Sequence, residues 1–134
     1  MVPVQRGFTL IELIAVMVIV GVMSVTLFSR LGSVNSTSVQ ASRDDLIAAL
    51  FFAQQTAMAR SGVQLVVSSS SVSVTENLPP VTSLQSYNFA NGVSATPLTL
   101  SYDKLGRTTS STITLTNSVG ASAMVNVEAS GYAH

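Results

Sequence analysis

The sequence predicts an α+β protein in which one long N-terminal helix precedes a small antiparallel β-sheet. Residues from Phe8 to Phe28 form an apolar run with a single charge, Glu12, and beyond this run apolar residues recur at helical spacing to about Arg60. From Val63 onward, short stretches alternate between apolar and polar residues and are separated by turn residues, which is typical of antiparallel strands. We therefore expect the second half of the helix to pack on the sheet.

The apolar run from residue 8 to residue 28 is long enough to cross a membrane as a helix. Its 21 residues, at about 1.5 Å each, match a hydrocarbon core of roughly 30 Å. Glu12 lies near the start of the run, and an acidic residue in such a position is a functional-site hypothesis that needs a partner. A plain membrane anchor stays open as an alternative, but such an anchor has no use for Glu12.

The second half of the predicted helix, from about Val39, is amphipathic. Its apolar positions recur at steps of three and four residues, at Leu46, Ile47, Leu50, Ala53 and Ala57. The preceding segment 33–38 is rich in short polar side chains that compete for the backbone, so we expect a bend or loosened turn there. Ser61-Gly62 supplies a stop signal for the helix.

The remainder of the chain predicts a series of short strands. The first two form a hairpin across Ser69–Ser71. The expected strands are 63–68, 72–76, 84–90, 98–102, 109–116 and 123–129, with turns at Asn91-Gly92, 103–106 and 118–120.

Composition limits the possible partners. Among the 134 residues only 9% are charged, the formal net charge is zero, and no Lys or Arg follows Arg107. No basic surface is therefore available for phosphate contacts, and we expect no nucleic-acid partner. The chain contains no cysteine, which rules out a disulfide.

The titratable residues do not form a recognisable catalytic or metal site. His134 is the single histidine and the last residue, and we expect it to lie in a disordered end. Asp44 and Asp45 are adjacent, so their side chains diverge on a helix and belong to a solvated face. Asp103 precedes Gly106 and is expected to form a turn rather than to bind calcium. We predict no enzymatic activity, no cofactor and no metal.

The segment Gly7-Phe8-Thr9-Leu10-Ile11-Glu12 resembles the class III signal of type IV prepilins and of the pseudopilins of type II secretion. The resemblance implies that a prepilin peptidase cuts after Gly7, that Phe8 becomes an N-methylated N-terminus, and that Glu12 becomes the fifth residue of the mature chain. It also implies three parts. Residues 1–7 are a leader, 8–28 a transmembrane and later filament-core helix, and 29–134 a periplasmic or extracellular globular domain.

The same resemblance implies a place and a set of partners. The chain waits in the bacterial inner membrane as a single-pass protein with its C-terminus in the periplasm, and then enters a pilus or pseudopilus. Its partners are the prepilin peptidase, inner-membrane lipid, the inner-membrane assembly platform and other pilin or pseudopilin subunits. Through charge pairing, Glu12 guides assembly, either with its own N-terminal amine or with that of a neighbouring subunit.

The second half of the chain is similar to minor pseudopilins of the GspH/FimT type, including minor pilins of mannose-sensitive haemagglutinin pili. The likeness rests on the amphipathic helix, on Leu100–Asp103 before Gly106-Arg107, and on a final strand that leads into Gly131. It implies a minor structural subunit. Two alternatives stay open: a tip-located minor pilin that binds a surface, DNA or a secreted substrate, and a membrane-anchored periplasmic sensor.

Overall fold

The computed structural model describes residues 9–134, with side chains described for 9–26 and 36–134. The chain divides into two units, Met1–Val34 and Asn35–His134. One helix, α1 (Leu10–Ala59, 50 residues), belongs to both units, and all strands belong to the second. The helix was predicted to end at about Arg60 and ends at Ala59, and the α+β fold class is confirmed.

The second half of α1 packs into the core of the globular unit through a continuous stripe of small and apolar side chains. The fully or almost fully buried members are Val39, Ser42, Leu46, Ala49, Leu50, Ala53 and Ala57. The predicted positions were correct except for Ile47, which is half-buried. Three- and four-residue steps keep this stripe on one face of the helix, so the helix itself forms one wall of the core.

The segment 33–38 continues as α-helix, and the loosened turn predicted there is wrong. The next turn explains this result. Val39 and Ser42 are each only 1% exposed, and the Ser42 hydroxyl oxygen accepts a hydrogen bond from the Ala90 backbone N–H at 3.0 Å. Since tertiary packing stabilises helices more than intrinsic propensity does, these contacts outweigh the weak helix propensity of the preceding serines.

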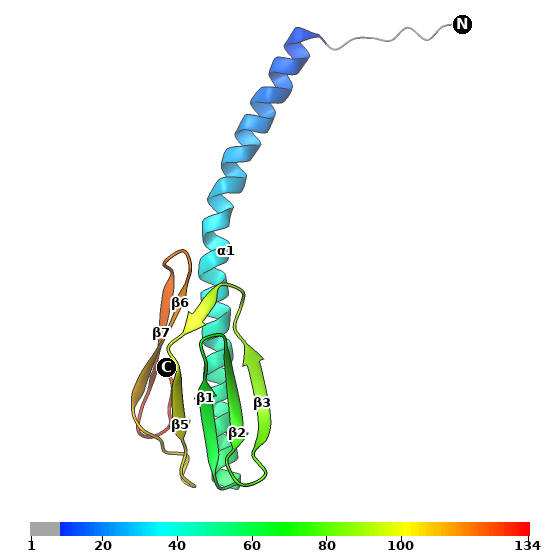
Figure 1. Ribbon diagram of the computed structural model, residues 1–134. Coiled ribbons are helices and arrows are strands. Elements are labelled where there is room, and N and C mark those ends of the chain that lie inside the picture. The colour runs from blue at the N-terminus through cyan, green and yellow to red at the C-terminus, as the bar shows by residue number, and fades with distance from the viewer. Residues whose placement is uncertain (1–8) are drawn as a thin grey trace, which may run out of the picture. The chain divides into compact units, whose positions relative to one another are not determined.

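The strands form two antiparallel sheets, whereas the sequence predicted one. The four-stranded sheet has the order β3-β2-β1-β5 and the three-stranded sheet has the order β4-β6-β7. Figure 1 shows the second half of α1 against the four-stranded sheet, with β6 and β7 beside β5. The strand bounds are β1 Val63–Val67, β2 Ser71–Glu76, β3 Thr82–Asn88, β4 Val93–Ala95, β5 Leu98–Ser101, β6 Ser111–Asn117 and β7 Ser122–Val127.

Alternation places one face of each sheet in a common core with α1. On β1 the residues Val63, Leu65 and Val67 are buried, while the residues between them are half-buried. Ile113 and Leu115 of β6 lie in the same core cluster. Of the seven strands, the sequence missed only β4, which at three residues is too short to show a periodic pattern.

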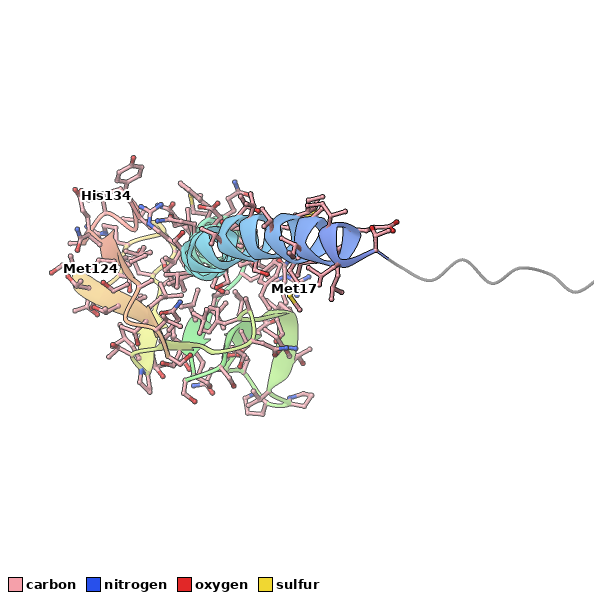
Figure 2. The ribbon with its side chains drawn as sticks, turned by 90° about the horizontal axis from the view of Figure 1, so that it is seen from above. Met17, Met124 and His134 are labelled. Atoms are coloured by element: carbon pink, nitrogen blue, oxygen red, sulfur yellow. The ribbon has the colours of Figure 1, made fainter. Side chains whose placement is uncertain are left out.

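The C-terminal end of the chain is ordered, which corrects the expectation for His134. The backbone N–H of His134 donates to the carbonyl oxygen of Asn126 at 3.0 Å, and the N–H of Asn126 donates to that of His134 at 2.8 Å. The His134 ring also stacks on Tyr132, with centroids 5.6 Å apart. Met124 and His134 both lie on this C-terminal part of the molecule (Figure 2).

Three segments distant in sequence meet at Gly131. The side-chain amide of Gln54 in α1 donates to the carbonyl oxygen of Ser130 at 3.1 Å. Gly131 has a φ of 85°, and a Cβ at this position would lie 2.0 Å from the carbonyl oxygen of Gly106. Only glycine fits here, because both the backbone conformation and the close approach exclude a side chain.

Candidate assembly site at the N-terminal end of the helix

The predicted processing residues Gly7 and Phe8 lie outside the described residues. The described chain begins at Thr9, which is the N-cap of α1 because the helix starts at Leu10. The backbone N–H of Glu12 bonds both to the Thr9 carbonyl oxygen at 3.1 Å and to the Thr9 hydroxyl oxygen at 3.3 Å. Thr9 therefore satisfies a backbone donor that the helix itself cannot pair.

Glu12 occupies the third helical position, and its side chain is exposed. The spacing Thr-x-x-Glu is that of a capping box, in which a threonine hydroxyl binds the N–H of the third residue. A carboxylate in the first turn also interacts favourably with the positive end of the helix dipole. Glu12 thus has a local role in starting the helix, in addition to any role in pairing between subunits.

The helix that follows is apolar on every side. Every large apolar side chain from Leu10 to Val25 is between 48% and 77% exposed, and Met17 is one of those that project from it (Figure 2). The two hydroxyls in this region bond to the helix backbone: Ser24 donates to the Val20 carbonyl oxygen at 2.7 Å and Thr26 to that of Met23 at 2.8 Å. A helix with this composition needs an apolar environment from outside its own chain.

Among the described residues, no helix has both the length and the apolar character that crossing a membrane requires. The predicted span 8–28 starts at a residue outside the described part. Its bounds, like those of the leader 1–7 and of the globular domain 29–134, stay predictions.

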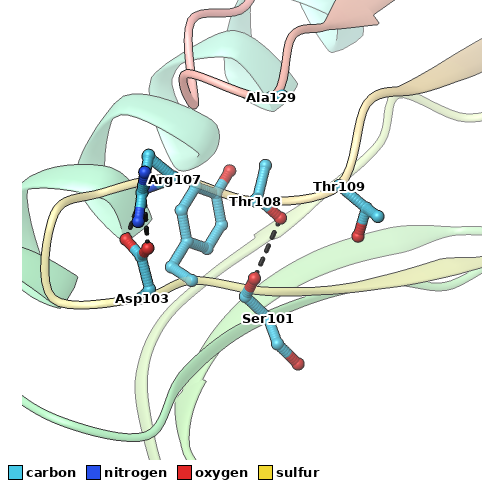
Figure 3. A pocket seen from close by; sticks show the side chains of 7 residues that line it. Ser101, Asp103, Arg107, Thr108, Thr109 and Ala129 are labelled. Carbon is cyan, nitrogen blue, oxygen red and sulfur yellow. Dashed lines mark hydrogen bonds and ion pairs between the residues drawn. The ribbon is translucent and has the colours of Figure 1, made fainter.

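The globular unit has an open hollow of about 550 Å³ where β5 leads into the turn before β6. Figure 3 shows the side chains that line it: Ser101, Tyr102, Asp103, Arg107, Thr108, Thr109 and Ala129. The hydroxyl of Thr108 donates to the Ser101 carbonyl oxygen at 2.9 Å. Within the described part of the chain, the buried Tyr102 hydroxyl has no hydrogen-bond partner. Burial raises the pKa of Tyr102 to about 12, so the phenol is neutral at physiological pH.

Asp103 forms the turn beside this hollow, as the sequence predicted. One carboxylate oxygen accepts the backbone N–H groups of Arg107 at 2.8 Å and of Leu105 at 2.9 Å, and the other accepts the Arg107 Nε at 2.9 Å. The backbone N–H of Arg107 is the main cause that lowers the pKa of Asp103, and the guanidinium adds to the effect. The carboxylate is thus engaged in holding its own turn.

The other acidic residues do not meet. In the part of the chain that the structure describes, no three His, Asp or Glu side chains lie close enough to share a metal ion. The Asp44 side chain is 76% exposed, and its nearest cation, Arg43, is 4.0 Å away.

One comparison with known proteins gives a match. A family model described as the prokaryotic N-terminal methylation motif matches residues 3–28. The chain carries a type IV prepilin-like or pseudopilin N-terminus. This motif implies processing by prepilin peptidase, anchoring in the inner membrane before assembly, and assembly with pilin subunits. Pilin-family proteins that carry this motif are structural and non-enzymatic. No curated protein and no solved structure matches the chain.

Sequence reasoning missed two features of these sites. It treated Glu12 only as a charge in need of a partner, although the spacing from Thr9 to Glu12 is a readable capping signal. It also did not find the hollow beside Tyr102, because Ala129 reaches this turn only through a contact between segments distant in sequence, in which the Thr108 N–H donates to the Ala129 carbonyl oxygen at 3.1 Å.

Proposed function

We propose that the chain is a minor structural subunit of a type IV pilus or a type II secretion pseudopilus, of the GspH/FimT type. Cleavage after Gly7 and methylation of Phe8 prepare the N-terminus, and the helix then leaves the lipid and joins other subunits. The observation that carries the proposal is the uncovered apolar helix of residues 10–25, which lies within the methylation motif of residues 3–28. Lipid and neighbouring helices are the two environments that suit such a surface.

Glu12 sets the axial position of the subunit in this proposal. The N-terminal amine of a processed chain is positive at neutral pH. When Glu12 docks beside the amine of a neighbouring subunit in a region of low dielectric, the two opposite charges compensate each other and fix the register. The exposed carboxylate at the third helical position is free to face such a neighbour.

Four variants separate charge pairing from helix capping. Glu12→Val removes both functions of the side chain, and Glu12→Asp shortens its reach. Glu12→Gln removes the charge but keeps a side chain that can complete a capping box, while Thr9→Val removes the cap and keeps the charge. Each variant is expressed with the partner pilins, its mass is measured to confirm the N-terminus, and its amount in sheared filaments is quantified.

Charge pairing predicts that Glu12→Gln and Glu12→Val lose incorporation to a similar extent, that Glu12→Asp is intermediate, and that Thr9→Val incorporates well. If Glu12→Gln matches the unaltered chain and Thr9→Val does not, capping is the relevant role. Membrane insertion of Glu12→Val should not fall, because a polar penalty has been removed.

Processing has its own test. In a host with the peptidase, intact mass should show the loss of residues 1–7 and one added methyl on Phe8. Gly7→Arg should block this cleavage, because a side chain then occupies a position where glycine has none. A mature wild-type chain that still begins at Met1 would contradict the proposal.

A second candidate function is a tip-located subunit that binds a surface or a secreted substrate. The open hollow beside Tyr102 favours it, since concave sites with a few polar groups are typical of binding. We expect no sub-micromolar DNA binding in a gel-shift assay at physiological salt, because no Lys or Arg follows Arg107. A subunit that appears in membranes but never in sheared filaments or crosslinks to pilins would instead support a periplasmic sensor.

A further inference from the structure

β3 is the outer strand of the four-stranded sheet, and no strand lies beyond it in Figure 1. The direction of its backbone groups follows from the ladder. The Phe89 N–H donates to the Ser70 carbonyl oxygen at 2.9 Å, and antiparallel pairs alternate between bonded and non-bonded. Tyr87 and Gln85 therefore bond to β2. The N–H and C=O groups of Ser86 and Asn88 point to the open side, where no described residue bonds to them.

The other sheet edges are shorter or partly occupied. The end of the β7 edge pairs with the C-terminal residues through the bonds between Asn126 and His134, and the Met124 carbonyl oxygen accepts the Arg43 Nε at 3.3 Å. On β5 the outward carbonyl oxygen of Ser101 accepts the Thr108 hydroxyl, and β4 has only three residues. Since proteins usually protect their sheet edges, β3 differs from the rest of the domain in leaving several backbone groups available.

A hollow of about 400 Å³ lies directly beside this edge. Its wall on the strand side is Leu84, the extra residue of a β-bulge that pairs with no residue of β2. Its wall on the helix side comes from the last turns of α1, and the lining is Phe52, Gln55, Thr56, Ala59, Arg60 and Leu84. A strand added to β3 would direct every second side chain toward α1, which brings one of them into this hollow.

The hollow has an apolar floor and a cationic rim. Phe52 and Leu84 are partly buried against the core. The Arg60 side chain is 57% exposed, and its Nη1 lies 3.3 Å from a Glu76 carboxylate oxygen. Its other guanidinium nitrogens bond to no described residue, so an acidic group on the incoming segment can pair with them.

We propose that the β3 edge binds an extended segment of another polypeptide as an added antiparallel strand. One apolar side chain of that segment enters the hollow beside Leu84, and an acidic group beyond it pairs with Arg60. The main-chain bonds of Ser86 and Asn88 supply affinity, while the hollow and Arg60 supply selectivity. The site belongs to the globular unit alone, so it does not depend on the role proposed for Glu12.

The test uses a peptide whose chemistry matches the site. Acetyl-Ser-Val-Ser-Val-Thr-Glu, the sequence of β2, places two valines on one face and an acid at its end. The full chain in detergent micelles is titrated with the labelled peptide, and binding is followed by fluorescence anisotropy. Amide signals of Ser86 and Asn88 are followed by NMR. We expect saturable binding with slower hydrogen exchange at these two amides.

Matched variants identify the contacts. Ser86→Pro removes the outward donor, should keep the β2 pairing because the lost N–H faces solvent, and should weaken binding at least tenfold. Ser86→Ala keeps the donor and should bind as the unaltered chain does. Gln55→Trp fills the hollow from an exposed helix position and should also weaken binding, which keeps the proposal testable if Ser86→Pro does not fold.

Three results would overturn the proposal. The first is no saturable binding of the peptide below about 1 mM. The second is unchanged binding to both Ser86→Pro and Gln55→Trp. The third is a concentration-dependent dimer that Ser86→Pro abolishes, since the edge would then be occupied by a second copy of this chain rather than by another polypeptide.

Discussion

Residues 10–25 and residues 39–57 belong to one continuous helix, yet their apolar side chains have opposite surroundings. In the first stretch every large apolar side chain is at least 48% exposed, whereas in the second Leu46 and Leu50 are fully buried. Both are helical throughout, so the backbone does not distinguish them. The difference lies in what covers the side chains: two sheets of the same chain cover the second stretch, and in the function proposed above lipid or other subunits cover the first.

This comparison separates folding from assembly. Substitutions in 39–57 should alter the stability of the globular unit, while substitutions in 10–25 should alter insertion and assembly but leave that stability unchanged. Pairs of similar substitutions, one in each region, test this separation directly. Each is measured by denaturant unfolding of the full chain in micelles.

The largest effect is expected from removing a buried leucine. Leu50→Ala should lower the free energy of unfolding by about 2–5 kcal/mol, because it removes core contacts and leaves a cavity. Leu13→Ala removes the same atoms from a side chain that is 54% exposed. It should change the free energy of unfolding by less than about 0.5 kcal/mol. Equal losses for the two variants would show that residues 10–25 also belong to the folding unit.

Two glycines give the next contrast. Gly131→Ala should cost roughly 1–3 kcal/mol from its positive φ alone, with a further loss from the close approach to Gly106. A Cβ added at Gly21 would meet no atom of another segment within 4 Å, so Gly21→Ala should leave the unfolding midpoint of the globular unit unchanged. In the N-terminal half of α1 the same substitution should favour the helical conformation by about 1 kcal/mol. A lower midpoint for Gly21→Ala would contradict the comparison, and reduced filament incorporation would locate a close contact with a neighbouring helix.

Two serines give a smaller contrast. Ser42→Ala leaves the half-buried Ala90 N–H without its acceptor and should cost about 1–3 kcal/mol. The Ser24 hydroxyl donates to the carbonyl oxygen of Val20 in its own helix, so Ser24→Ala should be neutral for the globular unit. If Ser42→Ala is also neutral, a water molecule replaces the lost bond, and solvent reaches this part of the interface between helix and sheets.

The smallest effect concerns pH and lies in the globular unit. Hydrogen bonds from Arg107 lower the pKa of Asp103. A lowered carboxyl pKa stabilises the fold above the unfolded value of about 3.9, and the contribution is lost as pH falls through the folded pKa. Asp103→Asn should therefore reduce stability slightly at neutral pH and have little effect once the pH is below the lowered pKa of Asp103. A variant with the same stability difference at both pH values would show that the turn does not depend on the charge.

Much of this fold could be predicted from local pattern. The helix bounds follow from helical spacing and from Ser61-Gly62, and the hairpin of β1 and β2 follows from two β-branched runs around three serines. The Asp103 turn was readable because Asp and Gly at this spacing have a local reason to form one. Glu12 stood out because a single acid interrupts an apolar run.

The features that sequence could not predict depend on distant partners. The division into two sheets is decided by which strands pair, and the periodicity of a strand contains no information about its neighbour. The order of the C-terminal end depends on bonds between His134 and Asn126, which only the position of β7 makes possible. Continuity of α1 through 33–38 depends on the burial of Val39 and Ser42 against strands that follow much later.

By itself the sequence determined the elements, the apolar N-terminal helix and its processing signal, because each of these arises from residues that are neighbours in the chain. The tertiary structure alone decided how the strands divide between two sheets, where Gly131 must be glycine, and that the edge of β3 stays open. These features arise where segments far apart in sequence meet, and the free energy of such contacts depends on their geometry rather than on local composition.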